Sequence, residues 1–235
     1  MRRIIATAGI IIFAVFLYIS TQFLHAKIVL DRSITHNHGE YVVLLHGLGR
    51  TTYSMHTVGL ELAKKGYRVI NLAYPTRSNT IEHLVEKHLK DELAEKYTDR
   101  DEKINFVTHS MGGIMVRYFL AHNELENVGR VVMLAPPNNG SEAADRWSHT
   151  IFMSAIMGPA LKELTTEEDS FVHKLPIPYY DVGIIAGEYD EKISVDRTKL
   201  AGMKDFLIVP REHTFIMNDR RVITSVVHFL YTGNF

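Results

Sequence analysis

The chain contains no cysteine among its 235 residues. Thiol nucleophiles, iron–sulfur clusters and zinc sites built on thiolates are therefore excluded. The lack of disulfides is compatible with either side of a membrane, because a domain of this size can rely on its hydrophobic core. The sequence also lacks internal repeats and low-complexity tracts, which excludes repeat architectures.

Charge of one sign is not in excess, since 26 basic and 27 acidic side chains leave a formal net charge of -1. No basic stripe is present, so we expect no nucleic-acid partner. With 46% hydrophobic and 23% charged residues, the composition is typical of one globular domain. No motif implies a metal ion or an organic cofactor, and the oligomeric state stays open.

The N-terminus carries a long apolar segment without charge, residues 4–24, directly after Arg2 and Arg3. As a helix, a segment of about 20 residues spans the hydrocarbon core of a bilayer. It shows no polar face, which argues against a helix buried in the domain. We therefore expect residues 1–26 to be a signal anchor or a signal peptide, and residues 27–235 to form the folded domain.

Cleavage of this segment is the less favoured alternative. Leu24 stands where a signal-peptidase site needs a small residue, which favours an uncleaved single-helix anchor. Arg2 and Arg3 give a small positive-inside bias, so we expect a cytoplasmic N-terminus and a domain on the extracytoplasmic side. A cleaved segment would leave the domain secreted or periplasmic. A polar linker at residues 33–40 is expected to follow the helix.

Apolar runs alternate with helical patterns through the rest of the chain. The predicted strands cover residues 41–46, 68–72, 103–108, 130–134, 182–186 and 206–209. The predicted helices cover residues 55–65, 80–97, 114–123 and 219–231. This alternation predicts an α/β fold, with a mainly parallel sheet, helices on both faces, and ligands beyond the carboxyl ends of the strands.

One of these strand-to-helix junctions reads Thr108-His109-Ser110-Met111-Gly112. A serine at the tip of such a sharp turn is typical of a nucleophile elbow, in which the hydroxyl is held above the sheet. Small residues are needed two positions before and after the serine, so that strand and helix can pass closely. Gly112 meets this need, whereas Thr108 replaces the usual glycine. An ordinary serine N-cap is the alternative.

A nucleophilic serine needs an imidazole to remove its proton. Among the 13 histidines, His213 follows the predicted strand 206–209 by a short turn and precedes the last helix. His109 is adjacent to Ser110 and is expected to point elsewhere. Surface or helix-packing positions account for the remaining candidates, which are His83, His88, His122, His149, His173 and His228.

The imidazole in turn needs a carboxylate. Asp190 lies in the loop just beyond the predicted strand 182–186 and is therefore the expected partner. Asp196 is a rival in the same loop. Glu188 is possible but lies too near the strand end to reach the histidine as easily. Asp181 precedes the strand and so lies at the wrong edge of the sheet.

A negatively charged oxygen that develops during acyl transfer needs two backbone N–H donors. The N–H of Met111, the residue after Ser110, is the expected first donor. The second is expected from Leu48 in the loop His46-Gly47-Leu48-Gly49, where the glycines let the backbone bend inward. A glycine-rich hairpin or phosphate loop is a weaker alternative, because no phosphate-binding spacing follows.

From about residue 41 to residue 230 the chain resembles the α/β-hydrolase superfamily, in particular its lipase-like and esterase-like serine hydrolases. The resemblance is carried by His-Gly-Leu-Gly, by Thr-His-Ser-Met-Gly-Gly, and by residues 135–141, which are similar to the Pro-x-x-Gly-Ser segment of bacterial lipases. It implies a catalytic domain over residues 27–235. It also implies a nucleophile, acid and base in that order at Ser110, Asp190 and His213, with an oxyanion hole at Leu48 and Met111.

Residues 141–180 interrupt the regular alternation with a segment rich in methionine and aromatic side chains. In the family that the chain resembles, insertions after the fourth core strand act as caps, and an apolar cap suits an acyl chain. Packing of a helix on the sheet is the alternative. We therefore expect a membrane-anchored serine hydrolase of hydrophobic or lipid esters. An acyltransferase, thioesterase or amidase with the same triad, and a non-catalytic binding module, are the other hypotheses.

Overall fold

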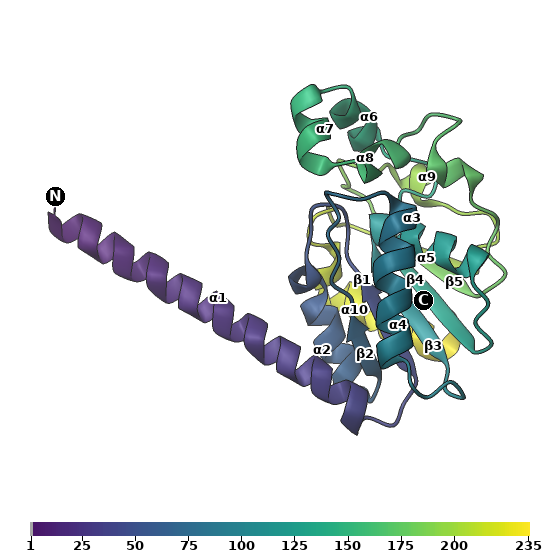
Figure 1. Ribbon diagram of the computed structural model, residues 1–235, viewed down its shortest axis with the longest axis horizontal. Helices are drawn as coiled ribbons and strands as arrows, with labels where there is room; N and C mark the ends of the chain where they lie inside the picture. Colours follow the sequence, from purple (N-terminus) through teal and green to yellow (C-terminus); the bar gives the residue numbers. More distant parts are fainter. Residues whose placement is uncertain (1) are drawn as a thin grey trace.

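Six parallel strands form one sheet in the order β2-β1-β3-β4-β5-β6 (Figure 1). The computed structural model describes residues 2–235, with side-chain surroundings described from residue 11 onward. The strands are β1 (Tyr41–Leu45), β2 (Arg68–Asn71), β3 (Ile104–His109), β4 (Val128–Leu134), β5 (Val182–Gly187) and β6 (Asp205–Val209). The predicted parallel α/β architecture is confirmed.

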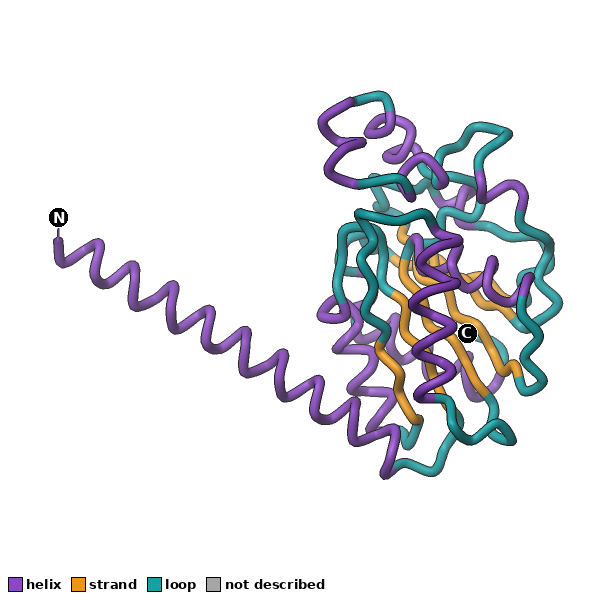
Figure 2. The backbone as a smooth tube through the Cα atoms, viewed as in Figure 1, coloured by secondary structure: helices purple, strands orange, loops and turns teal. Residues whose placement is uncertain are grey.

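Helices cover both faces of this sheet (Figure 2). Alternate strand side chains build two cores: Val43 and Phe106 pack with helices α3 to α5, whereas Val42 and Val107 pack with α2 and α10. Because both faces are buried at β1, β3 and β5, these strands appear in the sequence as largely apolar runs. The helices are α2 (His56–Lys64), α3 (Ile81–Leu84), α4 (Lys90–Lys96), α5 (Met111–His122), α9 (Val195–Thr198) and α10 (Arg220–Thr232), with a π-helical turn at Val85–Leu89 between α3 and α4.

The direction in which strands are added to the sheet reverses at β1. The chain places β2 on one side of β1 and then crosses to place β3 on the other. In open parallel sheets such a reversal opens a crevice at the carboxyl ends of the two strands concerned. The loop after β1 and the turn after β3 therefore meet at one place, which brings Leu48 and Ser110 to the same edge.

Three short helices follow β4 and lie together beyond the carboxyl edge of the sheet (Figure 1). They are α6 (Glu142–Ser148), α7 (Ile151–Met157) and α8 (Ala160–Glu163). Helix α7 has no buried residue, and its Ile151 and Phe152 side chains are among the most exposed of the large apolar ones. This segment is the expected small cap after the fourth core strand.

The N-terminal helix α1 runs unbroken from Arg2 to His36. The linker predicted at residues 33–40 is therefore wrong for residues 33–36. Packing against the domain explains why these residues are helical. Leu30 is buried in the core beside α2, and Ser33 Oγ accepts a hydrogen bond of 3.0 Å from the backbone N–H of Val69 on the edge strand β2. This contact ties the end of the helix to the domain without a flexible joint.

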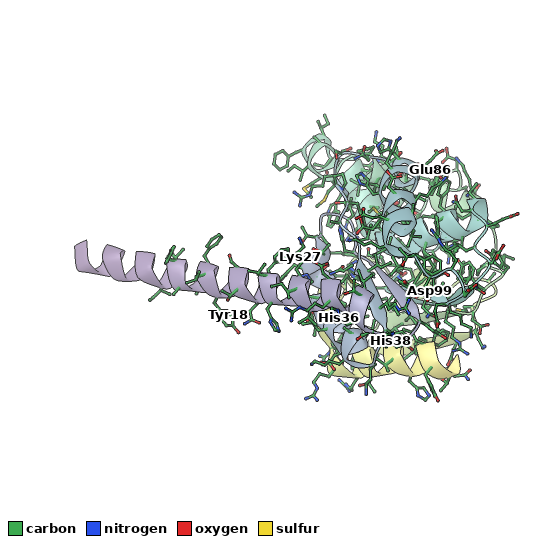
Figure 3. All side chains as sticks on the ribbon, turned by 60° about the horizontal axis from the view of Figure 1, so that its bottom comes forward. Tyr18, Lys27, His36, His38, Glu86 and Asp99 are labelled. Atoms are coloured by element: carbon green, nitrogen blue, oxygen red, sulfur yellow. The ribbon has the colours of Figure 1, made fainter. Side chains whose placement is uncertain are left out.

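The rest of α1 projects away from the domain, as Figure 3 shows with Tyr18 on the projecting part and His36 near the contact. Its described part from Ile11 to His36 is long and apolar enough to cross a membrane, and 6% of its most apolar window is buried. A signal sequence near an N-terminus meets the same criterion. Met1 of the expected segment 1–26 lies outside the described residues, as do the side chains of Arg2 and Arg3.

Candidate active site

Ser110 occupies the sharp turn between β3 and α5. Its backbone has φ 53° and ψ −124°, a conformation that side-chain-bearing residues rarely adopt. The turn is held by a hydrogen bond of 2.9 Å from the Ser110 N–H to the carbonyl of Leu134 on the neighbouring strand β4. Both partners are buried, so the serine has a fixed position at the carboxyl end of the sheet.

Two consecutive glycines let α5 lie close to the strands. A Cβ atom at Gly112 would come within 2.6 Å of the carbonyl oxygen of Leu45, so only glycine fits there. A Cβ at Gly113 would lie 3.1 Å from Pro136 Cβ and 3.4 Å from Thr108 Oγ1, so the second glycine is less tightly enclosed than the first.

Substitution of Gly112 by alanine should therefore destabilise the domain. We expect the free energy of unfolding to fall by about 1–3 kcal/mol, because the neighbouring atom is backbone and cannot turn aside. Gly113→Ala is the matched control: its nearest neighbour, at 3.1 Å, is a side-chain atom of Pro136, and its cost should be smaller. Urea unfolding of the two variants measures this difference, and equal costs would contradict the packing argument.

His213 and Asp190 form a direct hydrogen bond in the loops after β6 and β5. His213 Nδ1 lies 2.7 Å from Asp190 Oδ2, and both side chains are almost fully buried. The other carboxylate oxygen of Asp190 accepts the backbone N–H groups of Lys192 and Ile193 at 2.8 and 2.9 Å. The carboxylate is thus oriented by its own loop, and it fixes the histidine tautomer with the proton on Nδ1.

The rival acids lie elsewhere. Asp196 pairs with Lys199 at 2.7 Å, and its side chain is 87% exposed. Asp181 pairs with Lys204 before β5, and Glu188 is exposed. Of the carboxylates considered from the sequence, Asp190 is the one in contact with a histidine of the site.

The loop after β1 presents Leu48 beside the elbow. The Gly49 N–H donates to Thr76 Oγ1 at 2.9 Å, which holds this loop in place. A Cβ at Gly47 would lie 3.0 Å from the Cβ of Ser110, so loop and elbow are in close contact. Met111 begins α5, and the N–H groups of a first helical turn have no intrahelical acceptor. The expected donors Leu48 and Met111 therefore both belong to segments that border Ser110.

Ser110, His213 and Leu48 line one cavity of about 210 Å³. Apolar side chains of the cap, such as Trp147 and Leu161, form much of its remaining wall. The described hydrogen bonds include none between Ser110 Oγ and His213, so the two residues share the cavity without being joined. A small apolar chamber with a few convergent polar groups is typical of a ligand site.

His109 also lines this cavity, although it was expected to point elsewhere. Its Nε2 lies 3.0 Å from the backbone carbonyl of His213, and the two rings are 4.8 Å apart. Since a carbonyl can only accept, Nε2 carries the proton and donates it. His109 thus ties the nucleophile strand to the loop that carries His213. The available signal was a titratable residue directly before the elbow serine, at the end of a buried strand.

Burial keeps two histidines near the site uncharged. Desolvation lowers the pKa of His46 to about 4, and desolvation followed by the nearby His213 lowers the pKa of His109 well below its ordinary range. The unfolded chain would take up protons on both histidines below about pH 6.5, while the folded chain would not. Stability should therefore decrease as the pH falls through this range.

The expected slope is up to about 1.4 kcal/mol per pH unit for each of these histidines. Urea unfolding of the protein in detergent micelles at neutral and at mildly acidic pH measures it. His46→Gln should give a shallower dependence than the unchanged protein. Stability that is constant or rises on acidification would contradict the assignment of neutral buried imidazoles.

In the part of the chain that the structure describes, no three histidine, aspartate or glutamate side chains gather as metal ligands would. The site is instead built from a serine, an imidazole hydrogen-bonded to a carboxylate, and backbone amides. Such an arrangement has the components needed to activate a hydroxyl and to stabilise a negatively charged oxygen.

Residues 40–152 match the family described as the α/β-hydrolase fold. No curated protein matches the sequence significantly. The matched segment is a little under half of the chain, and together with the structural likenesses it shows that the chain has the α/β-hydrolase fold.

Several solved structures have a similar fold at low sequence identity. The mature lipase BlEst2 of Bacillus licheniformis is 18% identical with a TM-score of 0.61, and the match covers 82% of this chain and 92% of that chain. The phospholipase PlaB of Legionella pneumophila is 14% identical with a TM-score of 0.62, covering 82% and 58%. The type II thioesterase YbtT of yersiniabactin biosynthesis is 14% identical with a TM-score of 0.60, covering 84% and 95%.

Proposed function

We propose that the protein is a serine hydrolase that cleaves carboxylic esters through an acyl-enzyme intermediate. The observation that carries this proposal is the hydrogen bond of 2.7 Å between His213 and Asp190, beside the cavity that Ser110 lines. Because this bond occupies Nδ1 of His213, Nε2 is the nitrogen left to accept a proton from a hydroxyl. The lipase and thioesterase likenesses support the same class of chemistry.

In the proposed first half-reaction, Ser110 Oγ attacks the ester carbonyl carbon as His213 Nε2 takes its proton. The carbonyl oxygen becomes negatively charged and accepts hydrogen bonds from the N–H groups of Leu48 and Met111. Asp190 stabilises the imidazolium through Nδ1. Collapse of the intermediate breaks the bond to the alcohol oxygen, which leaves with the proton from His213, and the acyl group stays on Ser110.

In the second half-reaction a water molecule takes the place of the alcohol. His213 removes a proton from this water while the water oxygen attacks the acyl carbon, and the bond to Ser110 Oγ then breaks. The proton returns to Ser110, and the carboxylic acid leaves. The reaction needs no group beyond the substrate, water and these side chains.

We further propose that the acyl group is hydrophobic, as in a lipid ester. The wall of the cavity supports this, because Trp147, Met157 and Leu161 contribute apolar surface next to the polar groups. The likenesses to a lipase and to a phospholipase are consistent with it.

Turnover of three hexanoyl compounds tests the reaction type. The full-length protein in detergent micelles should hydrolyse 4-nitrophenyl hexanoate with a higher kcat/KM than the thioester S-phenyl thiohexanoate or the corresponding hexanoyl anilide. The likeness to YbtT favours a thioesterase as the second candidate, which predicts that the thioester is the best substrate.

Added methanol should yield little methyl ester if water is the natural acceptor. Failure to turn over any of the three would contradict the proposal and favour a binding module.

We also propose that α1 anchors the protein in a membrane, with the domain on the extracytoplasmic side. Ile12, Phe13 and Phe16 are each at least two-thirds exposed, and so large an apolar surface on one projecting helix needs apolar surroundings. The anchored protein should stay with membranes after extraction at alkaline pH. Recovery in the soluble fraction at full length would contradict an anchor, and recovery of a shortened chain there would favour cleavage.

A further inference from the structure

Three cationic side chains line the cavity that contains Ser110, and its described lining includes no carboxylate. They are Arg50, Arg77 and Lys192, and we call them the cation triplet. The rest of the lining is apolar or uncharged apart from the two histidines. Cations beside a mostly apolar cavity produce a positive potential there, because low-polarity walls screen charge poorly.

Arg77 is the member of the triplet without a described protein partner. Among the described residues, its guanidinium forms neither a hydrogen bond nor an ion pair, and it lies across Gly49 in the loop that carries Leu48. A Cβ at Gly49 would be 3.3 Å from Arg77 Nη2. The backbone of Arg77 lies against the cap, since a Cβ at Gly158 would overlap the Arg77 carbonyl oxygen. The guanidinium thus stands at the cavity, between the β1 loop and the cap.

Arg50 and Lys192 flank Thr214, the residue after His213. Arg50 Nη2 donates to the carbonyl of Thr214 at 2.9 Å, and Lys192 Nζ donates to its Oγ1 at 3.0 Å. Both partners are neutral. The one carboxylate near Lys192 Nζ is Glu191 at 3.9 Å, with its side chain 57% exposed, so it offsets little of the charge. The two cations are therefore oriented by neutral groups and keep most of their charge available.

The field of these two cations reaches the interior of the site. After desolvation and the neighbouring His213, Arg50 and Lys192 are further causes that lower the pKa of the fully buried His109. Arg50 and Lys192 therefore act on the region where the ester would react, and not only on the outer surface.

We propose that the substrate ester carries a negatively charged group, a phosphate or a carboxylate, which binds to the cation triplet. This inference rests on the proposed ester hydrolysis and names its substrate class. Charge-assisted hydrogen bonds from guanidinium and ammonium groups to such an anion are stronger than those to neutral groups. A neutral ester would leave the three charges without an anionic partner when it fills the cavity and displaces water.

The test compares matched substrate pairs with the full-length protein in neutral detergent micelles. One pair is soluble, mono-4-nitrophenyl adipate against 4-nitrophenyl hexanoate. The other pair is lipidic, dihexanoyl phosphatidylglycerol against dihexanoylglycerol. We expect the anionic member of at least one pair to have a kcat/KM about tenfold higher, or more. The pair that shows the preference identifies whether a soluble anion or a lipid headgroup is bound.

The ratio of kcat/KM within each pair is then measured in variants, which cancels any general loss of activity. Arg77→Gln and Lys192→Gln should each reduce the ratio, Arg77→Lys should retain most of it, and Arg77→Glu should reverse it. Arg220→Gln, which removes an exposed cation on α10, is the matched control and should not change it. In the unchanged protein, the ratio should fall between ionic strengths of about 0.01 and 1 M.

Ratios near one in both pairs, or a ratio that the variants and salt leave unchanged, would overturn the inference. If neutral esters are still hydrolysed and this depends on Ser110, the proposed function stands and the anionic substrate alone is wrong. If no ester of either charge reacts, the proposed function itself has failed. Cations that serve only to stabilise the reacting oxygen would act on both members of a pair alike, and would also leave the ratio near one.

Discussion

Ser110→Ala is expected to lower kcat/KM for ester hydrolysis by about 10⁵- to 10⁶-fold and to leave the domain folded. The variant lacks the attacking oxygen, so no acyl-enzyme can form, and only the donors around the cavity remain to assist water. The fold should persist because Ser110 is held by its backbone, through the N–H bond to Leu134, and not by a described side-chain bond. We therefore expect the variant to show almost no ester turnover while its unfolding midpoint stays unchanged.

Ser78→Ala is the matched control, because Ser78 is exposed and its hydroxyl bonds only to close neighbours in the chain, the carbonyl of Pro75 and the side-chain amide of Asn79. Its activity should equal that of the unchanged protein. Ester hydrolysis that survives Ser110→Ala at more than about one part in a thousand would mean that another group attacks the substrate.

Asp190→Asn should lower kcat by about 10⁴-fold. The amide can no longer stabilise a positive imidazole, and its NH₂ group donates where the carboxylate accepted. The histidine would then hold its proton on Nε2, the nitrogen that must accept one from Ser110. The neighbouring backbone donors of Lys192 and Ile193 can still bond to the amide oxygen, so the loop should keep its shape.

Asp196→Asn makes the same chemical change nearby, on the short helix α9, and is therefore the matched control. Its side chain is exposed and paired with Lys199, away from the histidine, so activity should stay within about twofold. A large loss in Asp196→Asn together with normal activity in Asp190→Asn would show that the acid has been assigned wrongly.

The position of the site could be predicted from the sequence because parallel strands end at one edge. Ser110 and Asp190 each follow a buried and largely apolar run, and His213 follows an apolar run on the partly exposed edge strand β6. Such runs are recognisable without any knowledge of their neighbours. The fold then brings the three loops together, since successive β-α units share one direction. Residues tied to strand ends are therefore the ones for which sequence patterns are most informative.

Contacts between distant segments could not be predicted in this way. The end of α1 is helical because Leu30 packs beside α2 and Ser33 hydrogen-bonds to β2. The polar composition of residues 33–36 does not indicate these contacts. His109 was expected to point away from the site, yet it bonds to the carbonyl of a residue 104 positions later. The cation triplet comes from three separate loops and leaves no spacing in the sequence.

For the apolar segment after β4, the sequence left two interpretations open, a cap beside the site or a helix packed on the sheet. Trp147, Met157 and Leu161 face the cavity and also pack against the core, so one set of side chains lines the site and stabilises the helices. Ile151 and Phe152, in the same apolar stretch, are instead exposed. Apolar composition alone could not separate these roles, because all of these residues lie on short helices with no clear period.

Labelling of the full-length protein with a fluorophosphonate, followed by mapping of the modified peptide, tests the central claim most directly. An activated serine attacks the phosphorus and expels fluoride, so the account predicts one adduct per chain, on Ser110, lost in Ser110→Ala and strongly slowed in Asp190→Asn. Ser141, which lines the same cavity, is an internal comparison and should stay unmodified. Folded protein that takes up no label, or takes it up on Ser141 instead, would contradict the account.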